Sequence, residues 1–459
     1  MKKIINIYTL AVAFISTSML STSCEKFVEL GAPPTQVLLE DAFRTDASAR
    51  SVVLGLYVST VNSNISGTTT FYAGMSADDL QYNGSDASLA EFANNGLLNT
   101  NSYVNNLWAS LYQLIKNTNN SVVGLERSNT LTPAVKDQLL GEAKFMRAYA
   151  YLQLVNLYGA VPLHLKSDLD VFEEVDLERS AVDQVYNQIV VDLTDAENKL
   201  ATAYEGTFRA RVNKHAASAL LARVYLYLGD YEKAETFSSK VLASSEYSLP
   251  APTSNFINDS RETIFQLANL TGFTTFGANY ITAPTISPIY SLPARVFNSF
   301  ETAPNVDLRK TNWVAPKMVS GTQYYAITKY KVSAGTGNEY HVVLRLAEQY
   351  LIRAEARANR NNLSGSKADV DAVRTRAGLT GISNDLTQTQ MLAAIETERL
   401  HEFFGEYAHR WMDLKRTNRA TAILSPIKPN WQTTDILFPI PNAQILINGK
   451  LTQNPGYED

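Results

Sequence analysis

Residues 211–243 read RVNKHAASALLARVYLYLGDYEKAETFSSKVLA, and their pattern is the clearest in the chain. Apolar residues recur at helical spacing on both sides of a central Gly-Asp pair, which is typical of a turn. We therefore expect one helix over 211–228 and a second, antiparallel helix over 231–243. Small residues such as Ala222 and Ala234 would let these helices approach closely, while aromatic side chains fill the groove between them.

The helix pair resembles a tetratricopeptide repeat, although a strict period of about 34 residues does not run through the chain. Two helix-start signals support further helices, namely Thr132 before Pro133 and a capping box of Ser180 with Asp183. The other helical segments that the spacing predicts are 142–158, 182–200, 342–358 and 389–416. The sequence therefore predicts a mainly α fold that is not a long regular solenoid.

Two stretches lack sustained helical spacing. Residues 59–100 are rich in Asn, Ser, Gly and Thr, which predicts a long loop region. Residues 250–340 contain several prolines and glycines, with short β-like runs at 263–267 and 324–330. This predicts a loop-rich segment with short β-strands between two helical halves. Prolines near the end of the chain predict an extended run over 437–441.

The N-terminus has the layout of a bacterial lipoprotein signal. Two lysines precede an apolar run over 4–15, and small residues precede Cys24, the one cysteine of the chain. In such signals the chain is cut before the cysteine, so residues 1–23 would be lost and the Cys24 thiol acylated. Ser21 departs from the large apolar residue usual at its position. A free cysteine behind a single-span anchor is the alternative, but the run is short for a spanning helix of about 20 apolar residues.

Charge and cysteine content exclude several classes. The formal net charge is −5 and no polybasic tract is present, so binding to nucleic acid or to an anionic membrane surface has no electrostatic support. A lone cysteine excludes an internal disulfide. Packing must therefore stabilise the fold, and a chain of 459 residues can bury a large core.

Eight phrases occur in a fixed order along the chain. They are EAKFMRA at 142–148, YGAVPL at 158–163, LRLAEQYLIRAEA at 344–356, VRTRAGL at 373–379, ERLHEFFGEY at 398–407, RWMDLKR at 410–416, FPIP at 438–441 and QNPGY at 453–457. Together they resemble the SusD/RagB family, the surface nutrient-binding lipoproteins of Bacteroidetes outer membranes. The Phe404-Gly405-Glu406 run departs from the glutamate-glycine pair that is more usual in that family.

The resemblance implies a SusD-like fold and a role. It implies an N-terminal helical half over 24–249 and a C-terminal half over 250–459, packed as one compact unit. It also implies a lipid-anchored protein on the outside of the outer membrane that binds a glycan or another oligomeric nutrient. The implied partner is a SusC-like TonB-dependent barrel transporter. A peptide-binding member of the family and a periplasm-facing scaffold of tetratricopeptide-like helices are the alternatives.

Sugars bind to flat aromatic faces flanked by polar side chains, which loops on a rigid scaffold present well. The two loop-rich regions supply both kinds of residue. The candidate ligand contacts are Tyr72, Asp78, Tyr82, Asn83 and Phe92 in the first region, and Phe276, Asn279, Tyr280, Tyr290 and Trp313 in the second. Ordinary packing is about as frequent a role for any one of these aromatics. Trp108 and Trp411 lie on helical patterns, and we expect them in the core.

A doubled Glu-x-x-His motif is the sharpest chemical signal. It places Glu398 with His401 and Glu406 with His409, a spacing that di-metal proteins use on facing helices. Here both motifs lie on one expected helix, roughly 12 Å apart along its axis, so they cannot share a two-metal centre. We therefore expect the motif to form a solvated or ion-paired surface. Within this segment Arg399 and Arg410 would form a structural ion-pair network with Glu398, Glu402 and Asp413.

The adjacent residues Asp78 and Asp79 are the other candidates for a catalytic acid pair. Glycoside cleavage needs two carboxyl groups that face each other across about 5–10 Å, whereas adjacent side chains usually point apart. A loop cap or a polar contact to ligand is the better interpretation. Since the sequence also lacks a nucleophile elbow and a phosphate-binding loop, we expect no enzyme, no cofactor and no metal site.

Overall fold

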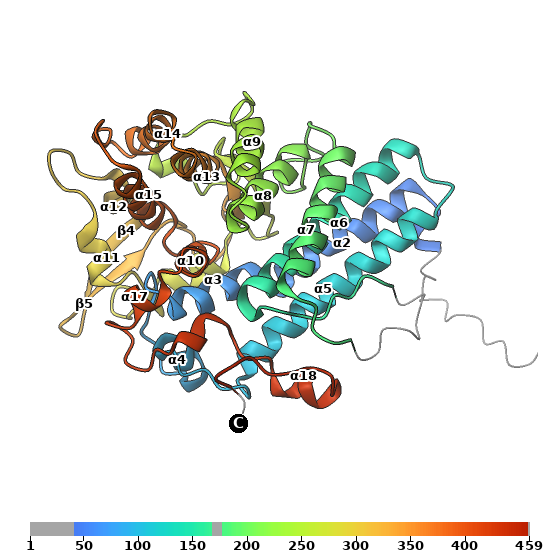
Figure 1. The fold of residues 1–459 in the computed structure, drawn as a ribbon, viewed down its shortest axis with the longest axis horizontal. Helices are drawn as coiled ribbons and strands as arrows, with labels where there is room; N and C mark the ends of the chain where they lie inside the picture. Colours follow the sequence, from blue (N-terminus) through green and yellow to red (C-terminus); the bar gives the residue numbers. More distant parts are fainter. Residues whose placement is uncertain (1–40, 168–176, 458–459) are drawn as a thin grey trace, which may run out of the picture. The chain divides into compact units, whose positions relative to one another are not determined.

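Helices make up most of the computed structural model, which describes residues 41–167 and 177–457 (Figure 1). The predicted mainly α fold is therefore confirmed. Residues 43–459 group into one compact unit, which is the part described below. The predicted signal peptide and Cys24 lie outside the described residues. The boundary between two halves near residue 249 stays a prediction.

Four long helices pack side by side in the N-terminal part of this unit (Figure 1). They are α2 (Asp46–Asn62), α5 (Ser102–Arg127), α6 (Pro133–Tyr158) and α7 (Val182–Lys199). Pro133 begins α6 as predicted, because its missing N–H is not needed at the first helical position. The predicted capping box of Ser180 with Asp183 is wrong, because the N-cap lies one residue later at an alanine, whose methyl group cannot accept a hydrogen bond. Ala181 is the N-cap of α7, and its N–H donates to the Gln184 side chain at 3.0 Å.

The predicted pair of antiparallel helices is confirmed. It consists of α8 (Lys214–Tyr227) and α9 (Tyr231–Leu242), and both Ala222 and Ala234 are fully buried. The rings of Tyr225 and Phe237 stack between the helices with centroids 5.4 Å apart. Helix α9 contacts α13 (Leu346–Asn359), which in turn packs on α14 (Leu363–Arg376) and α15 (Gln388–Phe403) (Figure 1).

Residues 59–100 are not the long loop that their composition predicts. The end of α2, α3 (Ile65–Ser76) and α4 (Ala87–Asn94) occupy most of this stretch. In α3 the hydroxyl groups of Thr70 and Ser76 donate to carbonyl groups four residues earlier, at 2.8 and 3.0 Å. Because their polar groups are satisfied inside the helix, these residues can be buried without an amphipathic pattern.

The strands of the described residues form three two-stranded antiparallel ladders. β2 (Thr263–Leu267) has the predicted bounds and pairs with β6 (His341–Arg345). β4 (Val314–Val319) pairs with β5 (Thr322–Ile327). The shorter elements are β1 (Gln81–Tyr82), β3 (Tyr290–Ser291), α10 (Thr275–Tyr280), α11 (Ala294–Ser299), α12 (Leu308–Trp313), α16 (His409–Arg416), α17 (Ala420–Leu424), α18 (Asn442–Ile447) and the 3-10 turns Asp41–Phe43, Pro252–Ser254 and Thr433–Ile436.

Two predicted helices differ from the structure. The segment 342–358 begins as strand β6, and helix α13 starts only at Leu346. The segment 389–416 is divided into α15 and α16, because Gly405, Tyr407 and Ala408 adopt positive φ angles that no helix contains. Trp108 and Trp411 are 3% and 0% exposed, so their predicted place in the core is confirmed.

Candidate ligand-binding site

The short β1–β3 ladder joins the two regions that contain the predicted ligand contacts. Tyr82 pairs with Tyr290 in this ladder, although more than 200 residues separate them in the sequence. Asn83 extends the hydrogen bonding between the two segments, because its backbone N–H donates to the Ile289 carbonyl at 2.9 Å. Its side-chain amide donates to the Pro288 carbonyl at 2.9 Å. The structure thus brings Tyr82, Asn83 and Tyr290 together at this ladder.

A stack of aromatic rings lies beneath this ladder. The ring of Phe71 in α3 stacks on Tyr290 with centroids 4.4 Å apart, and it contacts Phe276 and Tyr280 of α10 edge to face. The Tyr82 ring packs against Tyr290 at 5.9 Å. Because all of these rings except Tyr82 are buried, they hold the ladder rigidly instead of presenting a surface to ligand.

Tyr82 is fixed by its own turn. Its hydroxyl accepts a hydrogen bond from the Asp86 N–H at 2.8 Å. Gly84 lies so close that an added Cβ would be 2.5 Å from the Tyr82 hydroxyl, so a side chain there would displace the ring. The half-buried Tyr82 ring is therefore held in place before any ligand arrives.

Asp86 and Tyr103 supply the polar groups next to Tyr82. The Tyr103 hydroxyl donates to an Asp86 carboxylate oxygen at 2.7 Å, and Asp86 also caps the N-terminus of α4. The hydrogen bond from Tyr103 lowers the pKa of Asp86, and the same bond raises the pKa of Tyr103. Asp86 therefore stays ionised at neutral pH and offers acceptor oxygens to a hydroxylated ligand.

The predicted contacts divide into accessible and buried groups. Tyr82, Asn83 and Asn279 are partly exposed. The expectation that the other aromatics are exposed on loops is wrong, because helices and the β1–β3 ladder bury them. The buried predicted residues are Tyr72, Asp78, Phe92, Phe276, Tyr280, Tyr290 and Trp313. Within this group the rings of Tyr72 and Phe92 stack on each other with centroids 4.6 Å apart.

Asp86 and Tyr103 were not among the predicted contacts. Asp86 precedes the helical pattern of α4, so its capping role had a sequence signal. Tyr103 had none, because its hydroxyl reaches Asp86 only through the packing of α5 beside α4. The accessible rim thus consists of Tyr82, Asn83, Asp86 and Tyr103.

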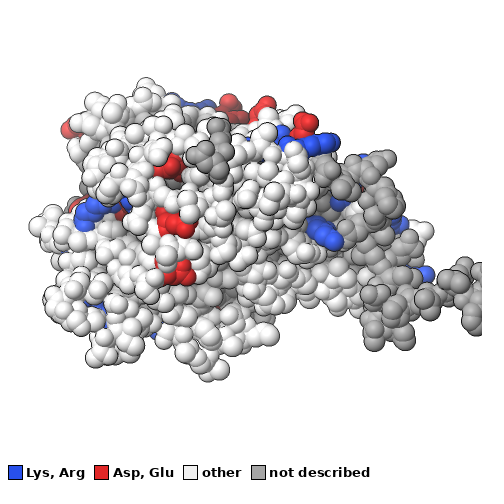
Figure 2. Space-filling model, turned by 90° about the horizontal axis from the view of Figure 1, so that it is seen from below, with Lys and Arg blue, Asp and Glu red and all other residues white. Residues whose placement is uncertain are grey.

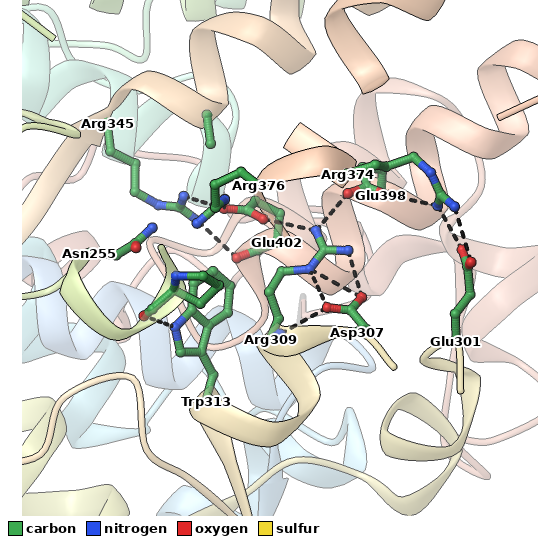
Figure 3. Close-up of polar contacts among 12 residues, drawn as sticks. Asn255, Glu301, Asp307, Arg309, Trp313, Arg345, Arg374, Arg376, Glu398 and Glu402 are labelled. Atoms are coloured by element: carbon green, nitrogen blue, oxygen red, sulfur yellow. Dashed lines mark hydrogen bonds and ion pairs between the residues drawn. The ribbon is translucent and has the colours of Figure 1, made fainter. Parts of the chain in front are cut away.

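Trp313 lies beside the buried arginines of the C-terminal part, with the guanidinium carbon of Arg376 5.4 Å from its ring centroid (Figure 3). It is 0% exposed, and its indole N–H donates to the Pro252 carbonyl at 2.7 Å. The Lys329 ammonium group lies 4.7 Å from its ring. Burial lowers the pKa of Lys329 to about 8 in spite of its ion pair with Glu406. Trp313 is therefore a packing residue of the C-terminal part of the chain.

The glutamates of the doubled motif belong to a buried ionic network (Figure 3). Glu402 accepts from Arg309 at 2.9 Å and from Arg345 at 2.5 Å, and it also pairs with Arg376. Glu398 pairs with Arg309 at 2.6 Å. Of the predicted network, Arg399 does pair with Asp413, but these two glutamates pair with arginines of other elements. The expected surface position of the motif is wrong, because both glutamates are buried.

The remaining members of the doubled motif also have partners. His401 contacts the Ser299 hydroxyl at 2.9 Å and stacks on Phe300. Glu406 binds Arg345 at 2.8 Å, and the His409 ring packs on Phe403. Across residues 41–167 and 177–457, no cluster of three or more His, Cys, Asp or Glu side chains is arranged to hold a metal ion.

Asp78 and Asp79 are both buried, and they have opposite environments. Asp78 pairs with Arg410 at 2.6 Å and with Arg295 at 2.7 Å. Burial alone would raise its pKa, but the two arginines lower it below the ordinary value. Asp79 accepts from the Gly405 N–H at 3.0 Å, and its other oxygen has no partner among the described residues. Neither carboxylate is a loop cap or an accessible ligand contact.

We expect Asp79→Asn to stabilise the protein above pH 7 by about 2–4 kcal/mol, since each unit of pKa shift is worth roughly 1.4 kcal/mol. Burial raises the pKa of Asp79 to about 7. The folded wild type therefore binds a proton that the unfolded chain releases near pH 4, so its stability falls as pH rises from about 4 to 7. Urea unfolding at pH 5 and pH 8 measures the effect, and the gain of the variant should be larger at pH 8.

Asp78→Asn is the matched control at the neighbouring residue, and it should lower the stability instead of raising it. It removes the carboxylate that faces Arg410 and Arg295, so we expect a loss of about 3 kcal/mol at neutral pH. Equal responses of the two variants would show that these adjacent carboxylates do not have the different environments described.

Charged side chains are sparse on the face to which α4 and α18 belong. Figure 2 shows that most of this face is uncharged, with acidic and basic side chains in small separate patches. Such a surface suits a neutral, hydroxyl-rich ligand better than a polyanion.

Comparison with known proteins places this chain in a family. Residues 38–226 match the family model described as "Starch-binding associating with outer membrane", and residues 297–457 match the model described as "SusD family". The chain belongs to the SusD/RagB family, as its ordered phrases predicted.

Individual relatives agree with this assignment. A SusD-like protein of Formosa agariphila is 25% identical over the full length of both chains. The starch-binding protein SusD of Bacteroides thetaiotaomicron is 30% identical over 26% of this chain and 22% of its own.

Solved structures show the same fold. A SusD superfamily protein from Bacteroides vulgatus superposes with a TM-score of 0.82 at 19% identity, covering 90% of this chain and 99% of its own. A structure titled "Laminarin binding SusD-like protein" gives a TM-score of 0.73 at 24% identity, covering 90% of this chain and all of its own.

Proposed function

We propose that this protein binds a glycan on the rim formed by Tyr82, Asn83, Asp86 and Tyr103, with Asn279 as a further contact. The observation that carries the proposal is the β1–β3 ladder, which holds a fixed, accessible aromatic ring beside an ionised carboxylate. A sugar offers an apolar C–H face to such a ring and hydroxyl groups to such a carboxylate. The buried aromatics of the predicted set act as the support.

The relatives supply the ligand class. One matching family model is described as starch-binding, and one relative of the same fold is described as laminarin-binding. Both names denote neutral glucose polymers, which agrees with the sparsely charged face in Figure 2. A neutral oligosaccharide is therefore the proposed ligand, and its binding requires no catalytic group.

A lipid on Cys24 would attach the protein to the outer membrane, facing the cell exterior. The support is the signal-like sequence before Cys24 and a family model whose description includes association with the outer membrane. In the part of the chain that the structure describes, no helix has the length and apolarity needed to cross a membrane. Protease treatment of intact cells tests the orientation. Protection until the outer membrane is opened would support the periplasm-facing scaffold instead.

A SusC-like TonB-dependent transporter is the proposed partner. If the protein captures ligand for such a transporter, deletion of the partner gene should abolish uptake of the glycan while the purified protein still binds it. Uptake of labelled oligosaccharide and affinity-gel retardation of the purified protein measure the two effects. Loss of glycan binding by protein purified from the deletion strain would contradict the proposal that the protein binds its ligand independently of the transporter.

A glycan screen tests the ligand class itself. Affinity gels that contain laminarin, starch or an acidic polysaccharide are run with the purified protein, and retardation by a neutral glucan is the expected result. Retardation by none of the three, together with binding of peptides to the same rim, would favour the peptide-binding alternative.

A further inference from the structure

A pocket of about 530 Å³ lies away from the β1–β3 ladder, where the turn between α8 and α9 faces α13, α15 and α16. In Figure 1 helix α13 lies between α9 and α15, and it contacts both. The volume is within the range of about 300–1,000 Å³ that is typical of small-molecule sites. None of the residues proposed above to bind the glycan lines this pocket.

The pocket is lined by equal numbers of positively and negatively charged side chains. Three arginines and three carboxylates line it, namely Arg399, Arg416, Arg419, Glu355, Glu396 and Asp413. Arg416 binds Glu355 and Asp413, at 2.7 and 2.8 Å. Towards solvent, Glu396 binds the exposed Arg419 at 2.8 Å, and it also binds Arg410, which does not line the pocket, at 3.0 Å. A ligand with one charge of each sign therefore matches the pocket better than an anion or a cation alone.

Arg399 has donors that the protein leaves unused. It is 3% exposed, and its Nε donates to Asp413 at 2.7 Å. Its two terminal nitrogens are buried and have no hydrogen-bond partner among the described residues. Buried charged donors are normally paired, but these two terminal nitrogens lack an acceptor. A carboxylate is the acceptor that a guanidinium group binds most strongly.

Apolar side chains form another wall of the pocket. Leu226 and Leu392 line it, together with Leu228, which is 45% exposed. The Tyr231 side chain also borders the pocket. A ligand that contacts both the charged residues and these apolar residues needs an apolar group close to its charged groups.

We propose that this pocket binds a small zwitterion with an apolar side chain, about the size of a dipeptide. Its carboxylate pairs with Arg399, its ammonium group lies near Glu396, and its apolar side chain packs on Leu392. The site is separate from the proposed glycan rim, so the two functions can fail independently.

Isothermal titration of the full chain in detergent with the dipeptide leucyl-leucine tests the site. The C-terminal amide and the N-acetylated form of the dipeptide each remove one charge, and galacturonate provides a carboxylate without an ammonium group. We expect each of the two modified dipeptides to bind at least tenfold more weakly than leucyl-leucine, and galacturonate not to bind.

Thr389→Trp blocks the pocket without touching its ion pairs. Thr389 is exposed and lines the pocket, whereas Thr397 is an exposed threonine of the same helix that does not line it. We expect Thr389→Trp to weaken leucyl-leucine binding at least tenfold and Thr397→Trp to leave it unchanged. No binding to the wild type, equal binding of the amide, or equal binding by the two variants would each overturn the proposal. Retardation of the same protein samples in a glucan affinity gel measures glycan binding at the rim separately.

Discussion

Glu402→Ala should lower the free energy of unfolding by about 3–5 kcal/mol, because it leaves buried arginines without their shared partner. Glu402 is 0% exposed and binds Arg309, Arg345 and Arg376, which come from three different elements. Urea unfolding of the wild type and the variant at pH 7 measures the loss. Glu232→Ala, at an exposed residue of α9, is the control and should change stability by less than about 0.5 kcal/mol.

The contribution of Glu402 should also depend on pH. Burial would raise the pKa of Glu402, but Arg376, Arg345 and Arg309 together lower it well below its usual range. The stabilisation is therefore fully present above the unfolded pKa of about 4.3 and is lost as pH falls below that value. A constant difference between wild type and Glu402→Ala from pH 7 down to pH 2 would contradict the ionic role of the network.

Tyr82→Ala should weaken glycan binding at least tenfold, which corresponds to about 1.4 kcal/mol. The ring is partly exposed and already fixed by the Asp86 N–H, so its removal deletes contact area without releasing a strained group. Affinity-gel retardation or titration with the glucan identified in the screen measures the change.

Tyr324→Ala provides the matched control for Tyr82→Ala. Tyr324 is also a partly exposed tyrosine on a two-stranded ladder, but it lies in β5, outside the rim. We expect its loss to change affinity less than twofold. Equal effects of the two substitutions would mean that the rim is not the binding site.

Periodicity predicted the elements whose stability is local. The α8–α9 pair and the start of α6 follow from apolar spacing, a turn signal and a proline at the first helical position. Strand β2 follows from a short apolar run. In each of these cases, neighbouring residues in the sequence are enough to specify the structure.

The misplaced elements depend on contacts between distant residues. Helix α3 has a loop-like composition, because its hydroxyl groups bond to its own carbonyls and its surface is buried by α5, α10 and the ladder. The break after α15 requires positive φ angles at Gly405 and Tyr407. Only tertiary packing explains why these conformations are adopted.

The candidate site was predictable by region but not by residue. The sequence indicated both segments that meet at β1 and β3, yet it could not show that Tyr290 and Phe276 would be buried beneath Tyr82. Aromatic residues have the same local pattern whether they face solvent or the core. The partner of Asp86, Tyr103, emerged only from the packing of α5.

Hydroxyl-radical footprinting of the protein with and without the bound glucan is the most direct test of the rim as the binding site. Oxidation of Tyr82 and Tyr103 should fall several-fold when the glucan is bound, while oxidation of Tyr324 and Tyr231 stays constant. Unchanged oxidation of Tyr82 and Tyr103 at saturating glucan would contradict the central claim.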